Sequence, residues 1–302
     1  MNIKENNFMT ISKNALTLFV CLLPASLFVS QAAYSETAYS ETPSAKTTQS
    51  QTVSLPQDSR VPGGIAVIPL ESAHKDSKIS FNGKQVWKIN NNGQYWAVIG
   101  IPLSQKIGQL TYKIDGKNHS IKIEDKSYRE QHLTVKKKHA NPPSYDMPRI
   151  RKESKLSKDA FNLFTDINKD KPYQQLLTPA QGPISSPFGL KRFFNEQPRR
   201  PHSGLDIAAP RGADIIAPMD GKIVLTGKFF FNGNSIFIDH GQGLVTMYCH
   251  MDKLESHEGQ WVKAGDVIGK VGSTGRATGP HLHWTVSLNN TRIDPLLFIA
   301  KP

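Results

Sequence analysis

Cysteine is nearly absent from this chain of 302 residues, which contains only Cys21 and Cys249. Cys21 falls within an apolar run near the N-terminus that, for the reasons given below, we expect to be removed. The remainder then keeps a single cysteine, which excludes an intramolecular disulfide. Stability must therefore come from packing or from a bound metal.

Long hydrophobic runs are also lacking, with one exception near the start. The segment Ala15–Val29 reads ALTLFVCLLPASLFV, follows Lys4 and Lys13, and precedes a stretch of small residues. This order is typical of a secretory signal peptide. The alternative is an uncleaved membrane anchor, but Pro24 interrupts the run, which is shorter than the roughly 18 residues that span a bilayer. We expect a signal peptide at 1–32 and an exported protein in the periplasm or cell envelope.

Acidic residues are scarce relative to basic ones, with 25 Asp and Glu against 37 Lys and Arg and a formal net charge of +12. A strongly basic exported protein is attracted to anionic polymers, which in a bacterial envelope are components of the cell wall and outer membrane. No nucleic-acid-binding motif accompanies the charge, and the aromatic residues follow apolar patterns. We therefore expect anionic envelope polymers as partners, and no nucleic acid.

The segment after the leader changes composition twice. Residues 33–52 repeat AYSET in tandem and contain few large aliphatic residues, which predicts a disordered tether. Residues 53–135 consist of short alternating runs separated by the turn dipeptides Asn82-Gly83, Asn92-Gly93 and Asp115-Gly116. This pattern predicts a small antiparallel β-sandwich of immunoglobulin-like type, an accessory domain without evident catalytic residues.

A basic, proline-bearing linker with one short helix is predicted over residues 136–176. The apolar residues at helical spacing in it are Leu156, Ala160, Phe161, Leu163 and Phe164. Residues 177–302 are strand-like and punctuated by glycine, with almost no helical period, which predicts a β-sandwich or barrel-like body. The expected fold class is therefore all-β with one linking helix.

Two histidine motifs in this last region point to a metal. In GPHLHW, Gly279–Trp284, a strand would direct His281 and His283 to the same face. Upstream, His202 and Asp206 form an HxxxD motif within RPHSGLDIAAPRG. On a helix these two side chains would share one face, but the nearby glycine and prolines predict a loop that enters a strand, so their alignment depends on tertiary structure.

The possible ligands match the needs of a catalytic zinc ion, which takes three histidine or carboxylate ligands and keeps one position open. His202, Asp206 and His283 would supply that set. His250, at the end of LVTMYCHM, and His281 would then lie beside the open position, able to move protons or stabilise an oxyanion. No glutamate of the HExxH kind is present, so a histidine must act as base.

Together, the HxxxD motif, the strand-borne YxH and the terminal HxH followed by an aromatic residue resemble the lysostaphin-type (LytM-type) zinc metallopeptidases, which cut peptidoglycan cross-bridges. The resemblance covers about residues 177–298 and includes SSPFG at Ser185–Gly189. It implies a duplicated hybrid motif in the C-terminal sandwich and Zn²⁺ as cofactor. By the same resemblance, the zinc ligands are His202, Asp206 and His283, and the catalytic pair is His250 and His281.

The same resemblance suggests the substrate and partners. It implies peptidoglycan stem peptides as substrate and, by analogy, a D,D-endopeptidase. The N-terminal sandwich and helix resemble more loosely the accessory domain of envelope-anchored members, which would suit an envelope protein partner.

Two other functions are compatible with parts of the sequence. Degenerate members of the same family act as metal-free scaffolds that activate another wall hydrolase, but they typically lack ligands that are all present here. The segments IIAPMDGKIVLTG and VKAGDVIGKVG resemble half-motifs of biotinyl and lipoyl carrier domains, yet no lysine stands in a carrier setting between them.

The remaining candidate residues receive structural interpretations. Cys249 precedes His250 and would face away from it in a strand, so we expect a buried core thiol and not an extra zinc ligand. His240 and His257 occur at predicted turns and are expected to be structural or solvated.

Overall fold

The computed structural model describes residues 55–91, 93–134 and 142–300. The predicted signal peptide (1–32) and the whole of the predicted tether (33–52) lie outside these residues. The described residues belong to one compact unit. Within the described residues, no helix has the length and apolar character needed to cross a membrane.

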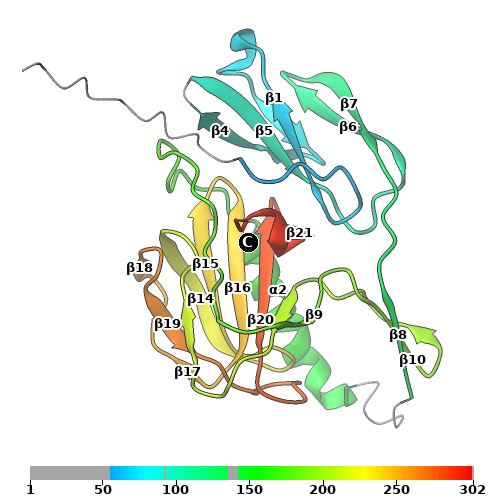
Figure 1. The fold of residues 1–302 in the computed structure, drawn as a ribbon, viewed down its shortest axis with the longest axis vertical. Coiled ribbons are helices and arrows are strands. Elements are labelled where there is room, and N and C mark those ends of the chain that lie inside the picture. The colour runs from blue at the N-terminus through cyan, green and yellow to red at the C-terminus, as the bar shows by residue number, and fades with distance from the viewer. Residues whose placement is uncertain (1–54, 92, 135–141, 301–302) are drawn as a thin grey trace, which may run out of the picture. The chain divides into compact units, whose positions relative to one another are not determined.

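The first β region contains two antiparallel sheets, as the alternating runs predict (Figure 1). One sheet has the order β1 (Ile65–Pro69), β5 (Gln94–Gly100) and β4 (Trp87–Asn91). The other has the order β3 (Lys84–Gln85), β2 (Ile79–Phe81), β6 (Gly108–Ile114) and β7 (Lys117–Ile123). A short 3-10 turn, η1 (Ser72–His74), follows β1.

The predicted turns have a clear backbone basis. Asn82 and Gly83, between β2 and β3, have φ of 49° and 73°, and Asp115 and Gly116, between β6 and β7, have φ of 47° and 80°. Two successive residues with positive φ match the twist of a tight hairpin, and Asn-Gly and Asp-Gly are the dipeptides that adopt this conformation most easily. The resulting β-sandwich buries its own apolar cluster, which includes Ile99 and Leu110.

The linking helix α2 (Met147–Phe161) follows a 3-10 turn, η2 (Ser144–Asp146). It begins within the basic, proline-bearing part of the linker. Pro148 is compatible with this start because it occupies the first helical turn, where no backbone N–H is needed. It ends at Phe161, so the prediction that Leu163 and Phe164 belong to the helix was wrong. Ala160 and Phe161 are buried, and the Phe161 ring lies 5.2 Å from that of Phe237.

The C-terminal region is built on one large sheet of eight strands, with the order β18-β14-β15-β16-β20-β12-β9 and with β21 added to β20 (Figure 1). Its strands are β9 (Ile184–Ser186), β12 (Leu205–Ile207), β14 (Gly221–Phe229), β15 (Gly233–Gly241), β16 (Leu244–Met251), β18 (Trp261–Val262), β20 (Leu282–Leu288) and β21 (Thr291–Ile293).

Two small sheets accompany it. One contains β13 (Asp214–Ile216), β19 (Val267–Lys270) and β17 (Lys253–Leu254). The other contains β11 (Gln197–Pro198), β10 (Lys191–Phe194) and β8 (Glu130–Leu133), where β8 pairs with β10 in parallel. The 3-10 turn η3 (Pro295–Leu297) lies near the end of the described chain.

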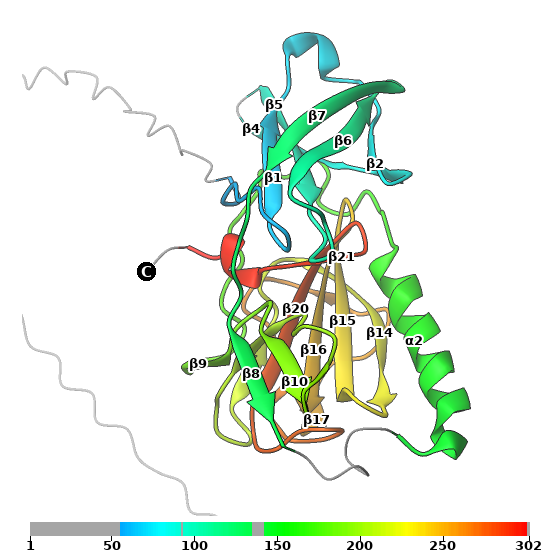
Figure 2. The same cartoon turned by 90° about the vertical axis from the view of Figure 1, so that its right-hand side faces the viewer.

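The two faces of the large sheet have different surroundings. Tyr248 and Trp284 are cross-strand partners, are fully buried and belong to the main apolar core. Met247 and Cys249 point to the other face, where they form a smaller cluster with Phe161 of α2. Figure 2 shows α2 running beside β14. Since cross-strand partners share a face, the pairing of Cys249 with His283 places the candidate site on the face that α2 partly covers.

A buried polar chain crosses the core behind this sheet. The His240 Nδ1–H donates to the Asp220 carbonyl oxygen at 2.9 Å, which leaves Nε2 to accept from the Thr246 hydroxyl at 2.8 Å. The Thr246 Oγ1 lies 2.8 Å from the Tyr248 hydroxyl. His240 is therefore structural, as the sequence suggested, and its burial lowers the pKa of the imidazole to about 4.

This buried histidine predicts a loss of stability in mild acid. The unfolded histidine takes up a proton near its ordinary pKa of 6.5, whereas the folded one does so only near 4, so stability falls as the pH drops through that window. We expect His240→Gln to remove the part of this dependence that comes from His240, roughly 3 kcal/mol for a fully buried imidazole, and to leave the part that comes from other buried histidines. Urea unfolding of the metal-free protein from pH 7 to pH 4 measures it.

The exposed His257 provides the matched control, and His257→Gln should leave the pH dependence of wild type intact. Equal slopes in wild type and His240→Gln would contradict the role assigned to His240.

Candidate metal centre

Strand register brings Asp206 and His283 together. Asp206 lies in the middle of β12, which pairs with β20 so that Asp206 and His283 are cross-strand partners. On its other side Asp206 faces Ser186 of β9. Directly opposed side chains on one face of an antiparallel pair are close neighbours, so the sheet itself sets this contact.

His202 reaches the same point from the segment before β12, past Gly204. A Cβ atom at Gly204 would lie 2.6 Å from the Trp284 carbonyl oxygen and 2.7 Å from the His283 ring. No side chain fits in that space, so glycine is required for the close approach of this segment to β20. The loop that the glycine and prolines predicted is therefore the element that delivers His202.

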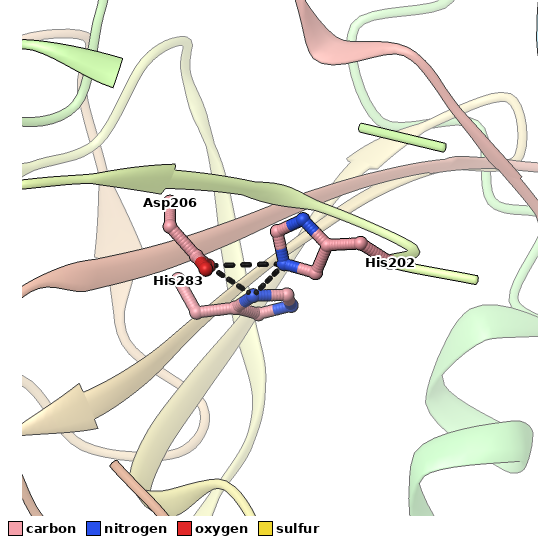
Figure 3. Close-up of side chains that lie close together, drawn as sticks. All are labelled: His202, Asp206 and His283. Carbon is pink, nitrogen blue, oxygen red and sulfur yellow. Dashed lines mark hydrogen bonds and ion pairs between the residues drawn. The ribbon is translucent and has the colours of Figure 1, made fainter. Parts of the chain in front are cut away.

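The three side chains converge within the sheet face shown in Figure 3. The Asp206 Oδ1 lies 2.7 Å from the His283 Nδ1 and 3.0 Å from the His202 Nε2, and these two nitrogens are 3.0 Å apart. His202 and Asp206 are buried, and His283 is half-buried. Among the described residues, these three form the one group of histidine, cysteine or carboxylate side chains with donor atoms gathered closely enough to hold a metal ion.

Hydrogen bonds on the outer side of each ring fix its tautomer. The His202 Nδ1–H donates to the Pro187 carbonyl oxygen at 2.9 Å, so its Nε2 carries a lone pair. The His283 Nε2 lies 3.1 Å from the Thr285 Oγ1, which can accept its proton and leave Nδ1 unprotonated. Two nitrogen lone pairs and a carboxylate oxygen then face one another. Such a set is repulsive without a cation between its members, and its chemistry fits a divalent metal ion.

The electrostatics agree with this arrangement. Burial by itself would raise the pKa of Asp206, but its close contacts with the His202 and His283 rings outweigh it and hold that pKa well below its usual range. Burial lowers the pKa of His283, against the opposing effect of Asp206. The carboxylate is therefore ionised and the imidazole neutral at pH 7, which are the forms that bind metal.

The two other predicted histidines stand beside this group. The His250 and His281 rings are 4.8 Å apart between centroids, and His250 lies 6.1 Å from His283. The His250 Nδ1–H donates to the Thr274 carbonyl oxygen at 2.8 Å, and the His281 Nδ1–H donates to that of Gly279 at 2.9 Å. Both rings therefore keep the Nε2 lone pair available. Burial lowers the pKa of His250 to about 4, so that its ring is neutral at pH 7.

Cys249 lies outside the donor group and is buried, as expected, but the reason given by the sequence was wrong. Its partner across β16 and β20 is His283, so it lies on the same face as the donors. Strand alternation would turn His250 to the opposite face. The backbone of His250 instead has φ of 62°, at the end of β16, and this turn brings the imidazole to the site.

Sequence reasoning missed the residue that supports the loop carrying Pro187. The Tyr128 hydroxyl donates to the Pro62 carbonyl oxygen at 2.6 Å, and its ring contacts Phe188 edge to face at 6.3 Å. Gly189 has φ of 78° and passes so close that a Cβ atom there would lie 2.1 Å from the Tyr128 ring. In the sequence, the glycine that follows SSPF indicates that the backbone passes close to another group. Nothing in the sequence identifies that group as Tyr128, which lies far upstream.

Comparison with known proteins identifies the family. Residues 200–295 match peptidase family M23, and residues 58–126 match the N-terminal domain of that family. A crystal structure from Pseudomonas aeruginosa, described as a candidate M23 peptidase, is 38% identical with a TM-score of 0.65, over 80% of this chain and 96% of that one. The chain belongs to peptidase family M23. The fold class and the predicted family resemblance are therefore confirmed.

Two curated relatives share part of this M23 chain. The DD-carboxypeptidase/endopeptidase Mpg of Neisseria meningitidis is 42% identical over 113 residues, which cover 37% of this chain and 26% of the relative. The peptidoglycan DD-endopeptidase ShyB of Vibrio cholerae is 39% identical over 146 residues, which cover 47% of this chain and 32% of the relative. The chain therefore spans about a quarter to a third of these relatives.

Metal content separates the two kinds of histidine in this M23 site. We expect His283→Ala to lose the bound metal, since one of three donors and the partner of Asp206 are removed together. We expect His281→Ala to retain it, because the His281 Nδ1 is engaged by a backbone carbonyl outside the donor group. Metal analysis of the purified variants after dialysis checks this, and equal loss in both would show that the roles are misassigned.

The contact of Tyr128 with the loop predicts an effect on metal affinity. Tyr128→Ala should weaken metal binding about 10-fold, as expected for loss of an outer support of a ligand. Tyr128→Phe keeps the ring against Gly189 and should cost less than about 3-fold. Competition with a chromophoric chelator measures both. Wild-type affinity in Tyr128→Ala would show that the loop holds His202 without this support.

Proposed function

We propose that this chain is a zinc-dependent endopeptidase that hydrolyses peptide cross-links of bacterial peptidoglycan, acting as a D,D-endopeptidase in the cell envelope. His202, Asp206 and His283 are the proposed zinc ligands, and His250 and His281 the proposed catalytic pair. Peptidoglycan stem peptides are the substrate, and anionic envelope polymers and an envelope protein are proposed partners of the basic exported chain.

One observation carries this proposal. Three electron-pair donors, the His202 Nε2, the Asp206 Oδ1 and the His283 Nδ1, lie 2.7–3.0 Å apart, with the outer nitrogen of each ring engaged elsewhere. Two more imidazoles with Nε2 available stand beside them. A set of two histidines and one carboxylate is a ligand combination of catalytic zinc sites, in which a further position stays open.

The names of the relatives support the substrate class. ShyB is named a peptidoglycan DD-endopeptidase and Mpg a DD-carboxypeptidase/endopeptidase. The region shared with Mpg is 113 residues long, and the region shared with ShyB is 146 residues long. Because that region is a minor part of both relatives, the specific bond cleaved is proposed by similarity and needs its own test.

The residues of the site suggest how amide hydrolysis would proceed. When bound, zinc supplies a Lewis acid that polarises the scissile carbonyl and lowers the pKa of water. His250 and His281, each with Nδ1–H fixed on a carbonyl oxygen, present Nε2 as a proton acceptor. This pair can take a proton from the attacking water, return it to the leaving amine and donate to the developing oxyanion. We assign these steps to the pair together.

Incubation with purified sacculi tests the proposal. The zinc-loaded protein from residue 33 onward should convert cross-linked muropeptides to monomers, and mass spectrometry of the products should identify cleavage of the D-alanyl cross-link. Chelator should abolish the activity, and added zinc should restore it. His250→Ala should retain zinc and lose at least about 100-fold in rate, the usual contribution of a general base or acid.

The exposed His257 again gives the control, and His257→Ala should keep wild-type activity. Stoichiometric zinc without release of cross-linked material would instead favour the scaffold function, in which the chain activates another hydrolase.

A further inference from the structure

Two charged side chains of the linker helix α2 contact the backbone at the end of β14, beside which the helix runs (Figure 2). Arg149 and Glu153 are four residues apart and therefore lie on one face of the helix. The Arg149 Nε donates to the Glu153 Oε1 at 2.7 Å, and the Arg149 Nη2 donates to the Lys228 carbonyl oxygen at 3.0 Å. The Phe230 backbone N–H donates to the Glu153 Oε2 at 2.7 Å. The helix thus holds β14 at its end.

The Glu153 contact differs from a second ion pair on the same helix. The Glu153 side chain is 16% exposed, and a carboxylate that accepts from a backbone N–H forms a stronger hydrogen bond than a neutral acceptor does. The pair of Lys155 with Asp159 joins side chains that are 77% and 54% exposed, where water weakens the attraction. Glu153 is therefore the acidic residue through which we expect α2 to act on the sheet.

The turn after β14, residues 230–232, is bonded to both segments that fix His250. The His250 backbone N–H donates to the Asn232 carbonyl oxygen at 2.7 Å, and the Arg276 backbone N–H donates to the Phe231 carbonyl oxygen at 2.9 Å. The loop of Arg276 also contains Thr274, whose carbonyl oxygen accepts from the His250 Nδ1–H at 2.8 Å. This one turn therefore supports both the backbone and the ring of His250.

Two glycines bring the turn and the Thr274 loop into direct contact. A Cβ atom at Gly233, where φ is 65°, would lie 2.3 Å from the Thr274 Oγ1, and one at Gly275, where φ is 72°, would lie 2.3 Å from the Gly233 backbone nitrogen. The Asn234 backbone N–H donates to the Thr274 Oγ1 at 2.9 Å. No side chain fits between the two segments, so a shift of the turn displaces the loop as well.

The backbone conformation of His250 requires such support. Its φ of 62° lies in the left-handed region, which is unfavourable for a residue other than glycine and persists only where surrounding contacts enforce it. The bonds to Asn232 and Thr274 are those contacts. If the turn shifts, His250 can relax to an ordinary strand conformation, and its ring then leaves the position beside the donor group.

We propose that Glu153 is a positioning residue for His250, acting through the 230–232 turn, so that contact of the linker helix with β14 sets the geometry of the proposed catalytic pair. This inference rests on the proposed function, in which His250 moves protons during amide hydrolysis. Glu153 holds the backbone of the turn, and the turn holds His250 and the Thr274 loop. A misplacement of about 1 Å at a reacting centre can cost about 100-fold in rate, so loss of this contact should be visible in kcat.

Steady-state kinetics on a soluble cross-linked muropeptide dimer test the proposal. Glu153→Ala should lower kcat about 10- to 100-fold and change KM less than about 2-fold, because it displaces a group that acts in the transition state. Glu153→Gln, whose amide oxygen can still accept from the Phe230 N–H, should stay within about 3-fold of wild type. Asp159→Ala, which removes the other paired acid of the helix, is the matched control and should keep the wild-type kcat.

NMR of the zinc-loaded protein with ¹⁵N-labelled histidine gives a readout that does not depend on cleavage. Wild type should show a slowly exchanging His250 Nδ1–H proton, assigned by its absence in His250→Gln. In Glu153→Ala this signal should broaden or disappear, whereas the signal of the buried His240 Nδ1–H should remain. Both signals should remain in Asp159→Ala. Zinc content and Tm of each variant are measured on the same samples.

The outcomes separate the positioning role from the proposed hydrolysis. A lost His250 signal in Glu153→Ala, with no cleavage by wild type, would support the positioning role and reject the hydrolysis alone. Cleavage by wild type together with an intact His250 signal or a wild-type kcat in Glu153→Ala would overturn the positioning role and leave the hydrolysis standing. A lower Tm with an intact His250 signal would assign Glu153 to stability alone, which also overturns it.

A second variant covers the case in which Glu153→Ala does not fold. Arg149→Ala removes an exposed side chain together with its hydrogen bond to the Lys228 carbonyl oxygen and its ion pair with Glu153. It should weaken the His250 signal and lower kcat in the same direction, by less than Glu153→Ala. An unchanged His250 signal in Arg149→Ala would then overturn the proposal.

Discussion

The arrangement of the site depends on three electron-pair donors that face one another at 2.7–3.0 Å. Two devices produce this arrangement: the register that opposes Asp206 to His283, and the glycine that lets the segment with His202 pass against β20. Lone pairs at such distances repel, so the surrounding structure must be firm enough to hold them. The buried β-sheet and the hydrogen bonds to the outer ring nitrogens provide that support, and a cation turns the repulsion into binding.

The support extends to residues far from the site in sequence. Tyr128, which follows the β-sandwich, packs on the loop whose Pro187 carbonyl fixes the tautomer of His202. The backbone N–H of Asp294 donates to the Gly63 carbonyl oxygen at 2.9 Å, and Ile65 and Val67 of β1 belong to the same apolar core as Trp284. The N-terminal segment is thus part of the packing behind the candidate metal centre, and a change in it is expected to alter metal affinity without touching any of the three donor residues.

Prediction from sequence succeeded where the determinants are local and failed where they are not. Asn-Gly and Asp-Gly gave hairpin turns because few other residues adopt positive φ so readily. The helix end was misjudged because Leu163 and Phe164 continue an apolar period without continuing the helix, which ends at Phe161. The orientation of Cys249 was derived from regular strand alternation, which fails at His250, where the backbone turns to φ of 62°.

The sequence by itself determined the all-β class, the position of the turns and the identity of the five candidate site residues, because these follow from residue type, alternation and motif. Only the tertiary structure decided that donors more than 70 positions apart meet and that the outer nitrogens of His202 and His283 are engaged. Strand register, glycine contacts and charge proximity are relations between distant parts of the chain, and they exist only once it has folded.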